Sequence, residues 1–279
     1  MHNRPHRHVG TEVISSPNNQ TLKFVRSLHH RKTREAEGAF VVEGRRAIAD
    51  ALAAGALPSL VLVREDMAGR LPELALPPGT PVRIVASALF DALSDTVTPP
   101  GLLAVFPVPE LPVPAHRAPL YLVLDRIRDP GNLGTLLRSA AGAGATAVLL
   151  TAGSVDPFNP KTVRSAMGAQ FRVPIRRLTP EYEDLVVANS PLRAVADAAA
   201  PTPYDALDWT QPATLIVGSE ATGPSDEIAA LATKEVSIPL AAGVESLNAA
   251  VAGSIILFEA ARQRRRGPRR SAPAGNAGH

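Results

Sequence analysis

The chain has 279 residues, 29 basic against 26 acidic side chains, a formal net charge of +3 and no cysteine. This length corresponds to one large or two modest domains, and 45% hydrophobic residues are enough for real cores, which excludes a mainly disordered chain. Without cysteine there is no disulfide framework, thiol nucleophile or cysteine-ligated zinc.

The positive charge is concentrated at the two ends of the chain. Residues 1–46 hold nine Lys or Arg against four acids, and residues 260–279 hold six Arg and no acid. The segment between them is left with 14 basic and 22 acidic side chains, a net charge of −8. The two ends are therefore the candidate surfaces for an acidic partner.

Neither a membrane span nor a secretory signal is predicted. The longest apolar stretch, residues 247–258, is shorter than the roughly 20 residues that a bilayer requires, and it contains Asn248 and Ser254. The first eight residues are rich in His and Arg and have no apolar stretch behind them. We expect a cytoplasmic protein without a membrane partner.

The first part of the chain predicts a small α/β domain over residues 15–106, after a flexible tail over residues 1–14. Leu22, Val25 and Leu28 recur every three residues and predict a basic amphipathic helix that starts near Ser16. Further helices are expected at 45–54 and 86–93, and strands at 40–43, 60–63 and 102–106.

A proline-rich linker over residues 107–118 follows. Pro107, Pro109, Pro112 and Pro114 remove backbone donors and favour an extended, fairly stiff conformation, which marks a domain boundary.

The second domain, over residues 119–266, alternates strands and helices more clearly. Strands are expected at 120–124, 147–150, 173–175, 192–195, 214–217 and 236–238, and helices at 132–143, 161–165 and 247–265. Continuous apolar strands separated by helices predict a mostly parallel sheet covered on both faces. Residues 267–279, rich in Pro, Gly and Arg, are expected to form a disordered basic tail.

Three loops after strands hold the unusual residues, where open α/β sheets bind ligands. In the first loop, the glycines around Asn132 would let the backbone approach a ligand. Asn132 and Arg138 are six residues apart, about 600° of helical rotation, so they share no face unless Asn132 precedes the helix. The alternative is that Asn132 is an N-cap and Arg138 a solvated charge.

The second loop, residues 218–223, follows an apolar strand directly. Glycine-flanked polar residues after a strand are typical of a nucleotide-binding turn, but Glu220 at the centre would repel a phosphate. A ligand with positive charge or hydroxyl groups fits better. The alternative is that Glu220 only interacts with the dipole of the next helix.

The third loop contains Ile238, Pro239 and Leu240 and ends at Ser246, which is a plausible N-cap for the last helix. Asn248 is harder to assign to a structural role, because an amide at the start of an apolar helix must find partners or remain exposed.

These motifs, in their order and spacing, resemble those of the SpoU/TrmH class of SPOUT RNA methyltransferases. They are Asn132-x-Gly134-x-x-x-Arg138, Gly218-x-Glu220-x-x-Gly223, and Ile238-Pro239-Leu240 with Ser246-Leu247-Asn248. The resemblance covers residues 120–265. Residues 15–18 and 40–44 are similar to the substrate-binding domain, related to a ribosomal protein, that many members carry.

The resemblance implies methylation of a ribose 2′-hydroxyl in structured RNA with S-adenosylmethionine. It also implies a homodimer formed through the second domain and a deep trefoil knot in that domain. The implied cofactor-binding positions are Gly218, Ile238, Leu240 and Leu247, and the implied catalytic positions are Arg138, Asn132, Glu220, Ser246 and Asn248. No metal is implied.

The chemistry constrains the role of Arg138. A ribose hydroxyl is a poor acid, so methyl transfer needs help with its proton and close positioning of oxygen and methyl carbon. An arginine with a pKa above 12 is a poor base. We therefore expect Arg138 to stabilise the developing alkoxide and clamp a phosphate, which leaves the acceptor of the proton open.

Ribosomal RNA, most simply 23S, is the expected substrate, with transfer RNA as the alternative. The candidate phosphate contacts are Lys23, Arg26, Arg31, Lys32, Arg34, Arg45 and Arg46, unless this patch is only a solvated face. A non-catalytic RNA-binding protein of the same fold is a second hypothesis. A nicotinamide-linked oxidoreductase is disfavoured, because residues 124–127 supply no glycine-rich turn.

Overall fold

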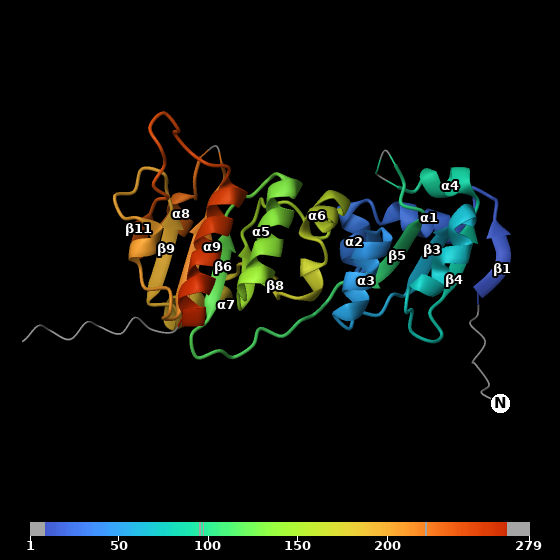
Figure 1. Ribbon diagram of the computed structural model, residues 1–279, viewed down its shortest axis with the longest axis horizontal. Helices are drawn as coiled ribbons and strands as arrows, with labels where there is room; N and C mark the ends of the chain where they lie inside the picture. Colours follow the sequence, from blue (N-terminus) through green and yellow to red (C-terminus); the bar gives the residue numbers. More distant parts are fainter. Residues whose placement is uncertain (1–8, 95, 97, 221, 267–279) are drawn as a thin grey trace, which may run out of the picture.

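The computed structural model describes residues 9–94, 96, 98–220 and 222–266, which form two sheets with their helices, side by side (Figure 1). The predicted tail over residues 267–279 and the first eight residues of the predicted N-terminal tail lie outside this part of the chain. None of the helices within it is long and apolar enough to cross a membrane.

The first sheet has the strand order β1-β4-β3-β5-β2. Its strands are β1 (Val9–Ile14), β2 (Ala39–Glu43), β3 (Leu60–Arg64), β4 (Val82–Val85) and β5 (Leu102–Pro107). The first three in this order are parallel, and β5 is antiparallel to β3 and β2. The helical elements are α1 (Gln20–Ser27), α2 (Arg31–Glu37), α3 (Arg45–Ala53), η1 (Glu65–Glu73) and α4 (Ser87–Asp91).

Two features of this sheet correct the sequence prediction. Residues 9–14, expected to belong to a flexible tail, form β1, because they extend the sheet by pairing in parallel with β4. The basic helix is divided into α1 and α2 by residues 28–30, and α1 begins after Asn19, whose side chain accepts a hydrogen bond from the Thr21 amide. Leu22, Val25 and Leu28 are fully buried, as their spacing predicts.

The second sheet is parallel throughout, in the order β11-β9-β10-β6-β7-β8. Its strands are β6 (Leu120–Leu124), β7 (Ala147–Leu150), β8 (Ile175–Arg177), β9 (Leu192–Ala196), β10 (Ala213–Val217) and β11 (Lys234–Val236). The helical elements are α5 (Pro130–Ala143), α6 (Pro160–Ala166), η2 (Ala169–Phe171), α7 (Pro180–Asn189), η3 (Tyr204–Ala206), α8 (Asp226–Ala229) and α9 (Ala249–Arg266).

Both faces of this sheet are covered, which confirms the prediction of a buried parallel sheet. Leu122 of β6 packs into a core with residues of α5 and α9, whereas Val123, pointing the other way, packs with residues of α7 and α8. Helices α5 and α9 lie next to each other over one face (Figure 1). The trefoil knot that the resemblance implies stays a prediction.

Strand positions differ from the prediction at both edges of the second sheet. β8 begins at Ile175, because Pro174 has no amide to donate and only its carbonyl joins the ladder, accepting from Val148. β11 ends at Val236, and Ile238 lies in the irregular segment before α9. Helix α7 is amphipathic only weakly and escaped the sequence analysis.

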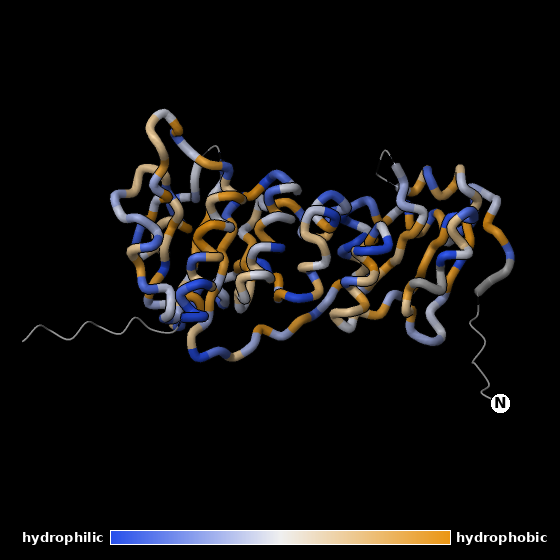
Figure 2. Tube along the Cα trace, viewed as in Figure 1, coloured by the Kyte–Doolittle hydropathy of each residue, from blue (hydrophilic) through white to orange (hydrophobic). Residues whose placement is uncertain are grey.

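The two domains share a hydrophobic core where they meet. Phe171 of the second domain lies against Phe40 and Phe106 of the first, with ring centroids 5.6 and 5.1 Å apart, and Phe158 lies 4.9 Å from Phe40. Figure 2 shows hydrophilic residues along α2 beside this junction. The aromatic contacts fix one domain against the other, so the proline-rich linker is not their only connection.

Candidate active site

The three predicted motifs meet at the carboxyl edge of the parallel sheet. The Asn248 side chain donates from Nδ2 to Oε1 of Glu220 at 2.6 Å and to Oδ1 of Asn132 at 3.1 Å. Asn132 in turn donates to the same Glu220 oxygen. One carboxylate is thus held by two amides that come from the first turn of α5 and from the residue preceding α9.

Asn132 lies inside α5 and is not its N-cap. The cap is Asp129, whose Oδ1 accepts from the Asn132 amide at 2.8 Å, and Pro130 occupies the first helical position. The alternative of Asn132 as an N-cap is therefore wrong. Its backbone is satisfied by Asp129, and its side chain is directed to Glu220.

Asn248, and not Ser246, caps the last helix. Its Oδ1 accepts from the amides of Ala250 at 2.9 Å and Val251 at 3.2 Å, which leaves Nδ2 directed toward Glu220. Ser246 is exposed and lies outside the helix, which begins at Ala249. Since the two ends of one amide serve two purposes, the start of α9 and the orientation of Glu220 are coupled.

Glu220 is not the residue that interacts with the dipole of the next helix. Asp226 and Glu227 occupy the first turn of α8, and Glu220 lies five residues before its N-cap, Ser225. The Glu220 side chain is exposed, and its hydrogen-bond donors within the described residues are the side-chain amides of Asn132 and Asn248. A partly exposed carboxylate with fixed orientation is suited to position a polar ligand.

A pocket of about 420 Å³ adjoins this cluster. Its lining includes all four predicted cofactor positions, Gly218, Ile238, Leu240 and Leu247, together with Glu220 and Ser246. Among the described residues that line it, Asp197, Glu220 and Glu235 are acidic and none is Lys or Arg. The pocket therefore favours a ligand with apolar parts and positive charge over a phosphate.

Two motif glycines are required for different reasons. A Cβ on Gly218 would lie 2.1 Å from the backbone nitrogen of Pro224, because the loop after β10 folds back on itself beside the pocket. A Cβ on Gly134 would lie 2.4 Å from the Cβ of Ser165, so this glycine permits close packing of α5 on α6. This packing accounts for Gly134, and the expectation that the glycines around Asn132 let the backbone approach a ligand stays a prediction.

Arg138 stands apart from the cluster within one chain. It is exposed on α5, fewer than two turns beyond Asn132 and about 120° around the helix from it. It makes no hydrogen bond or ion pair with another residue in the described part of the chain. The structure of a single chain thus brings Asn132, Glu220 and Asn248 together and leaves Arg138 facing outward.

Asp125 is a site-supporting residue that the sequence analysis missed. Its side chain is 2% exposed; Oδ1 accepts from the Thr151 hydroxyl at 2.6 Å, and Oδ2 accepts from the Ser225 amide at 2.7 Å and from Arg126. Burial alone would raise the pKa of Asp125, but the hydrogen bonds from Thr151 and Ser225 and the charge of Arg126 outweigh it and lower the pKa. The Ser225 bond anchors the end of the Glu220 loop.

The sequence signal that could have identified Asp125 is its position directly after an apolar strand.

Within the described ranges, no three His, Cys, Asp or Glu side chains are grouped as metal ligands would be.

The predicted phosphate contacts in the first domain are exposed, with one exception. Lys23 and Arg26 lie on α1, Arg31 and Lys32 on α2, and Arg45 and Arg46 on α3. Arg34 is buried, and its guanidinium pairs with Asp156 of the second domain through Nε at 2.9 Å and Nη2 at 2.5 Å. Arg34 is therefore a tie between the domains and not a phosphate contact.

Both domains of the chain match known protein families. Residues 119–258 match the SpoU rRNA Methylase family, and residues 19–104 match the MRM3-like substrate binding domain. The chain is 37% identical to the mitochondrial rRNA methyltransferase 3 of Mus musculus, over 89% of this chain and 73% of that protein. It is 33% identical to the 23S rRNA (guanosine(2553)-2′-O)-methyltransferase RlmP of Bacillus subtilis, over 88% and 97%.

A solved structure agrees with these relatives. The SpoU methyltransferase AviRb from Streptomyces viridochromogenes, in complex with the cofactor AdoMet, superposes with a TM-score of 0.80 and 31% identity, over 90% of this chain and all of that one. The resemblance predicted from the motifs is confirmed. The chain belongs to the SpoU rRNA methylase family and is an S-adenosylmethionine-dependent RNA methyltransferase.

Proposed function

We propose that this chain transfers the methyl group of S-adenosylmethionine to a ribose 2′-hydroxyl of 23S ribosomal RNA. The observation that carries the proposal is the convergence of Asn132, Glu220 and Asn248 beside a pocket lined by Gly218 and Leu247. RlmP, whose name gives a 23S 2′-O activity, aligns over most of this chain.

The pocket suits the cofactor in size and charge. A volume of about 420 Å³ lies within the range of small-molecule sites, and apolar walls from Ile238, Leu240 and Leu247 fit an adenine and a methionine chain. The acidic lining favours a sulfonium and an ammonium group. When bound, S-adenosylmethionine supplies an electrophilic methyl group.

The polar residues would then position the acceptor. Glu220 accepts from two amides and still has Oε2 free of any hydrogen bond within the described residues, so it can accept from a ribose hydroxyl. Asn132 and Asn248 hold that carboxylate in place, and Ser246 at the pocket wall offers a further hydroxyl. Positioning of this kind lowers the barrier by fixing oxygen and methyl carbon at attack distance.

A homodimer would supply Arg138 to this site. Val251 and Phe258 lie seven residues apart on the same side of α9 and are 45% and 47% exposed, which forms an apolar strip. Phe258 lies against Gly142 of α5, the helix that carries Arg138. A second copy that covers this strip would bring its Arg138 toward the cluster, where a guanidinium can stabilise the alkoxide and hold a phosphate.

The decisive assay incubates the protein with labelled S-adenosylmethionine and either 23S rRNA transcribed in vitro or total transfer RNA. We expect a single methylated ribose in 23S rRNA, located by mass spectrometry, and loss of labelling in Arg138→Ala with RNA affinity mostly retained. Labelling of transfer RNA alone would establish the alternative substrate. Absence of both labelling and cofactor binding, with RNA binding retained, would support the non-catalytic RNA-binding alternative.

We retain a cytoplasmic location as part of the proposal, although the relatives include mitochondrial proteins.

A further inference from the structure

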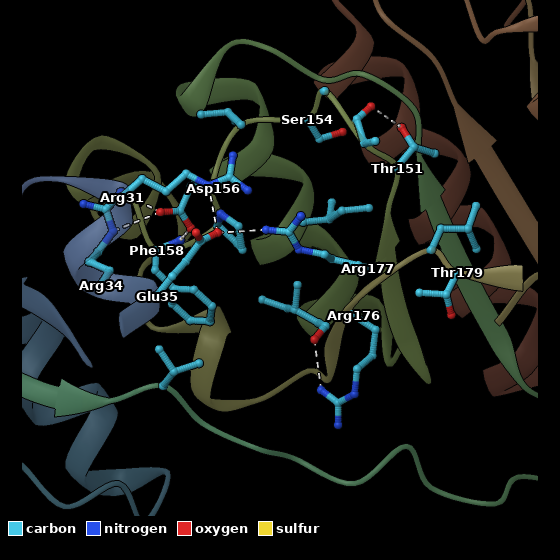
Figure 3. Close-up of a pocket in the computed structure, with 18 of the residues that line it drawn as sticks. Arg31, Arg34, Glu35, Thr151, Ser154, Asp156, Phe158, Arg176, Arg177 and Thr179 are labelled. Atoms are coloured by element: carbon cyan, nitrogen blue, oxygen red, sulfur yellow. Dashed lines mark hydrogen bonds and ion pairs between the residues drawn. The ribbon is translucent and has the colours of Figure 1, made fainter. Parts of the chain in front are cut away.

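A second pocket lies where the two domains meet. It has a volume of about 490 Å³ and is lined by α2 of the first domain and by the segments that follow β7 and β8 of the second (Figure 3). Of the candidate phosphate contacts, Arg31 and the buried Arg34 line it, and no predicted methyl-transfer residue does. The pocket is therefore separate from the cofactor pocket.

Two arginines at this pocket share one carboxylate. Arg31 Nε lies 3.0 Å from Glu35 Oε1, and Arg177 Nη2 reaches the same oxygen across the junction at 2.8 Å. The Arg31 and Arg177 side chains are 48% and 69% exposed. Because one carboxylate neutralises only one guanidinium, a positive charge with unused N–H donors faces the solvent at this pocket.

These two arginines differ from the buried arginine beside them. Arg34 is 4% exposed in its side chain, and it pairs with Asp156 and donates to the carbonyl groups of Leu28 and His29 at 2.7 and 2.8 Å. Arg34 and the aromatic cluster both contribute to the contact between the domains. The Arg31 and Arg177 guanidinium groups, by contrast, remain open to water.

The pocket lies at the same edge of the sheet as the methyl-transfer cluster. Thr151, in its lining, donates to Asp125, which also accepts from Ser225 in the loop that carries Glu220. β10, β6, β7 and β8 are consecutive neighbours, so β8 ends roughly 14 Å from β10 at about 4.8 Å per strand. On the first-domain side of the pocket, the exposed Lys32 follows Arg31 in α2.

We propose that this junction pocket binds the backbone of the substrate RNA, with Arg31 and Arg177 holding one phosphate at a distance from the methylated ribose. The chemical class recognised is a phosphodiester, and the apolar side chains of Val108, Phe158 and Ile175 leave a wall for the adjoining base. The inference rests on the RNA substrate of the proposed function. It adds a contact between the first domain and the transfer site.

The test uses the opposite charges of the shared ion pair. Arg177→Gln and Glu35→Gln each break the same contact across the junction, but they change the charge of the pocket in opposite directions. A phosphate site predicts that Arg177→Gln weakens binding of a labelled single-stranded oligoribonucleotide by about twofold to fivefold. The slope of log K against log salt should fall by about 0.7. Glu35→Gln should bind as tightly as wild type or more tightly.

Two outcomes would overturn the proposal. If both variants lose affinity alike, the pair only ties the domains together; if Arg177→Gln binds RNA with unchanged affinity and slope, the pocket does not touch phosphate. Lys234→Gln removes one exposed charge from β11, at the opposite edge of the sheet, and serves as the matched control. Thermal unfolding and titration with S-adenosylmethionine check that each variant is folded. If wild type fails to methylate 23S rRNA, the proposed substrate is wrong, but this binding comparison still decides the role of the pocket.

Discussion

The side-chain nitrogen Nδ2 of Asn248 lies 2.6 Å from Oε1 of Glu220, while Oδ1 of the same side chain caps α9. A single side chain therefore joins the start of the last helix to the carboxylate at the centre of the site. This relationship separates two effects of mutation, because the cap requires only an oxygen and the contact with Glu220 requires a nitrogen donor.

Asn248→Asp should leave the protein folded and impair methylation. The aspartate keeps an acceptor for the Ala250 amide, but it turns an oxygen toward Glu220, which then loses one of its two donors. We expect a free energy of unfolding close to wild type and kcat reduced about 10- to 100-fold, as for a misplaced catalytic group. Asn248→Ala should lose the cap as well and cost about 1 kcal/mol of stability. Wild-type kcat in Asn248→Asp would show that the bond to Glu220 is dispensable.

The neighbourhood of Asn132, Glu220 and Asn248 could be predicted because each residue follows a strand of a parallel sheet, and such strands end at one edge. The choice between Ser246 and Asn248 as the cap could not be predicted. Both residue types are good caps, and a helix boundary is uncertain by a few residues in sequence.

The roles of Asp125 and Arg34 could not be predicted from the sequence, because their partners are distant along the chain. Asp125 bonds to a residue 100 positions away, Ser225, and Arg34 pairs with a residue 122 positions away, Asp156. No local pattern encodes either contact, since each depends on how loops or domains are assembled. In the fold, β1 escaped prediction for the same reason: its polar neighbourhood resembles a tail, and only pairing with β4 makes it a strand.

Mixed dimers should test whether Arg138 acts across an interface. If the site combines Glu220 of one chain with Arg138 of its partner, Arg138→Ala and Glu220→Ala are each inactive alone but restore one complete site when co-expressed. We expect co-purified heterodimers, carrying two different tags, to recover up to about half of wild-type kcat. No recovery in verified heterodimers would mean that Arg138 acts within its own chain or not at all.

Gly218→Ala should weaken cofactor binding while the sheet remains folded. The new Cβ would lie 2.1 Å from the Pro224 nitrogen and 2.3 Å from the carbonyl carbon of Gly223, so the loop must open beside the pocket. We expect S-adenosylmethionine affinity, measured by calorimetry, to fall more than about tenfold. Gly69→Ala, where a Cβ meets nothing within 4 Å, is the matched control and should bind normally.

Removal of Arg34 should destabilise the junction more than removal of a surface charge. Arg34→Ala leaves Asp156, 12% exposed, without its guanidinium partner, and we expect a loss of about 3 kcal/mol in the free energy of unfolding. Asp91→Ala, which breaks a more exposed pair with Arg64, should cost less than about 1 kcal/mol. Denaturant titrations would measure both, and equal losses would show that burial of the Arg34 pair is unimportant.

Because its contacts lower the pKa of Asp125, the free energy of unfolding should decrease as the pH falls into the acid range. The pKa of Asp125 is lower in the folded state than the usual 3.8, so its carboxylate stabilises the fold above about pH 4, and this contribution disappears as the pH falls through the folded pKa.

Asp125→Asn should therefore unfold more easily than wild type at pH 7, by about 1–3 kcal/mol, because two of its donors lose a charged acceptor. The difference should shrink below pH 4, where the unfolded wild-type chain takes up a proton before the folded one does. S-adenosylmethionine affinity should also fall at pH 7, because Ser225 no longer anchors the loop to a carboxylate. A stability difference that stays constant from neutral to acid pH would mean that the substitution acts through packing, and the charge of Asp125 would then have no part in holding the Glu220 loop.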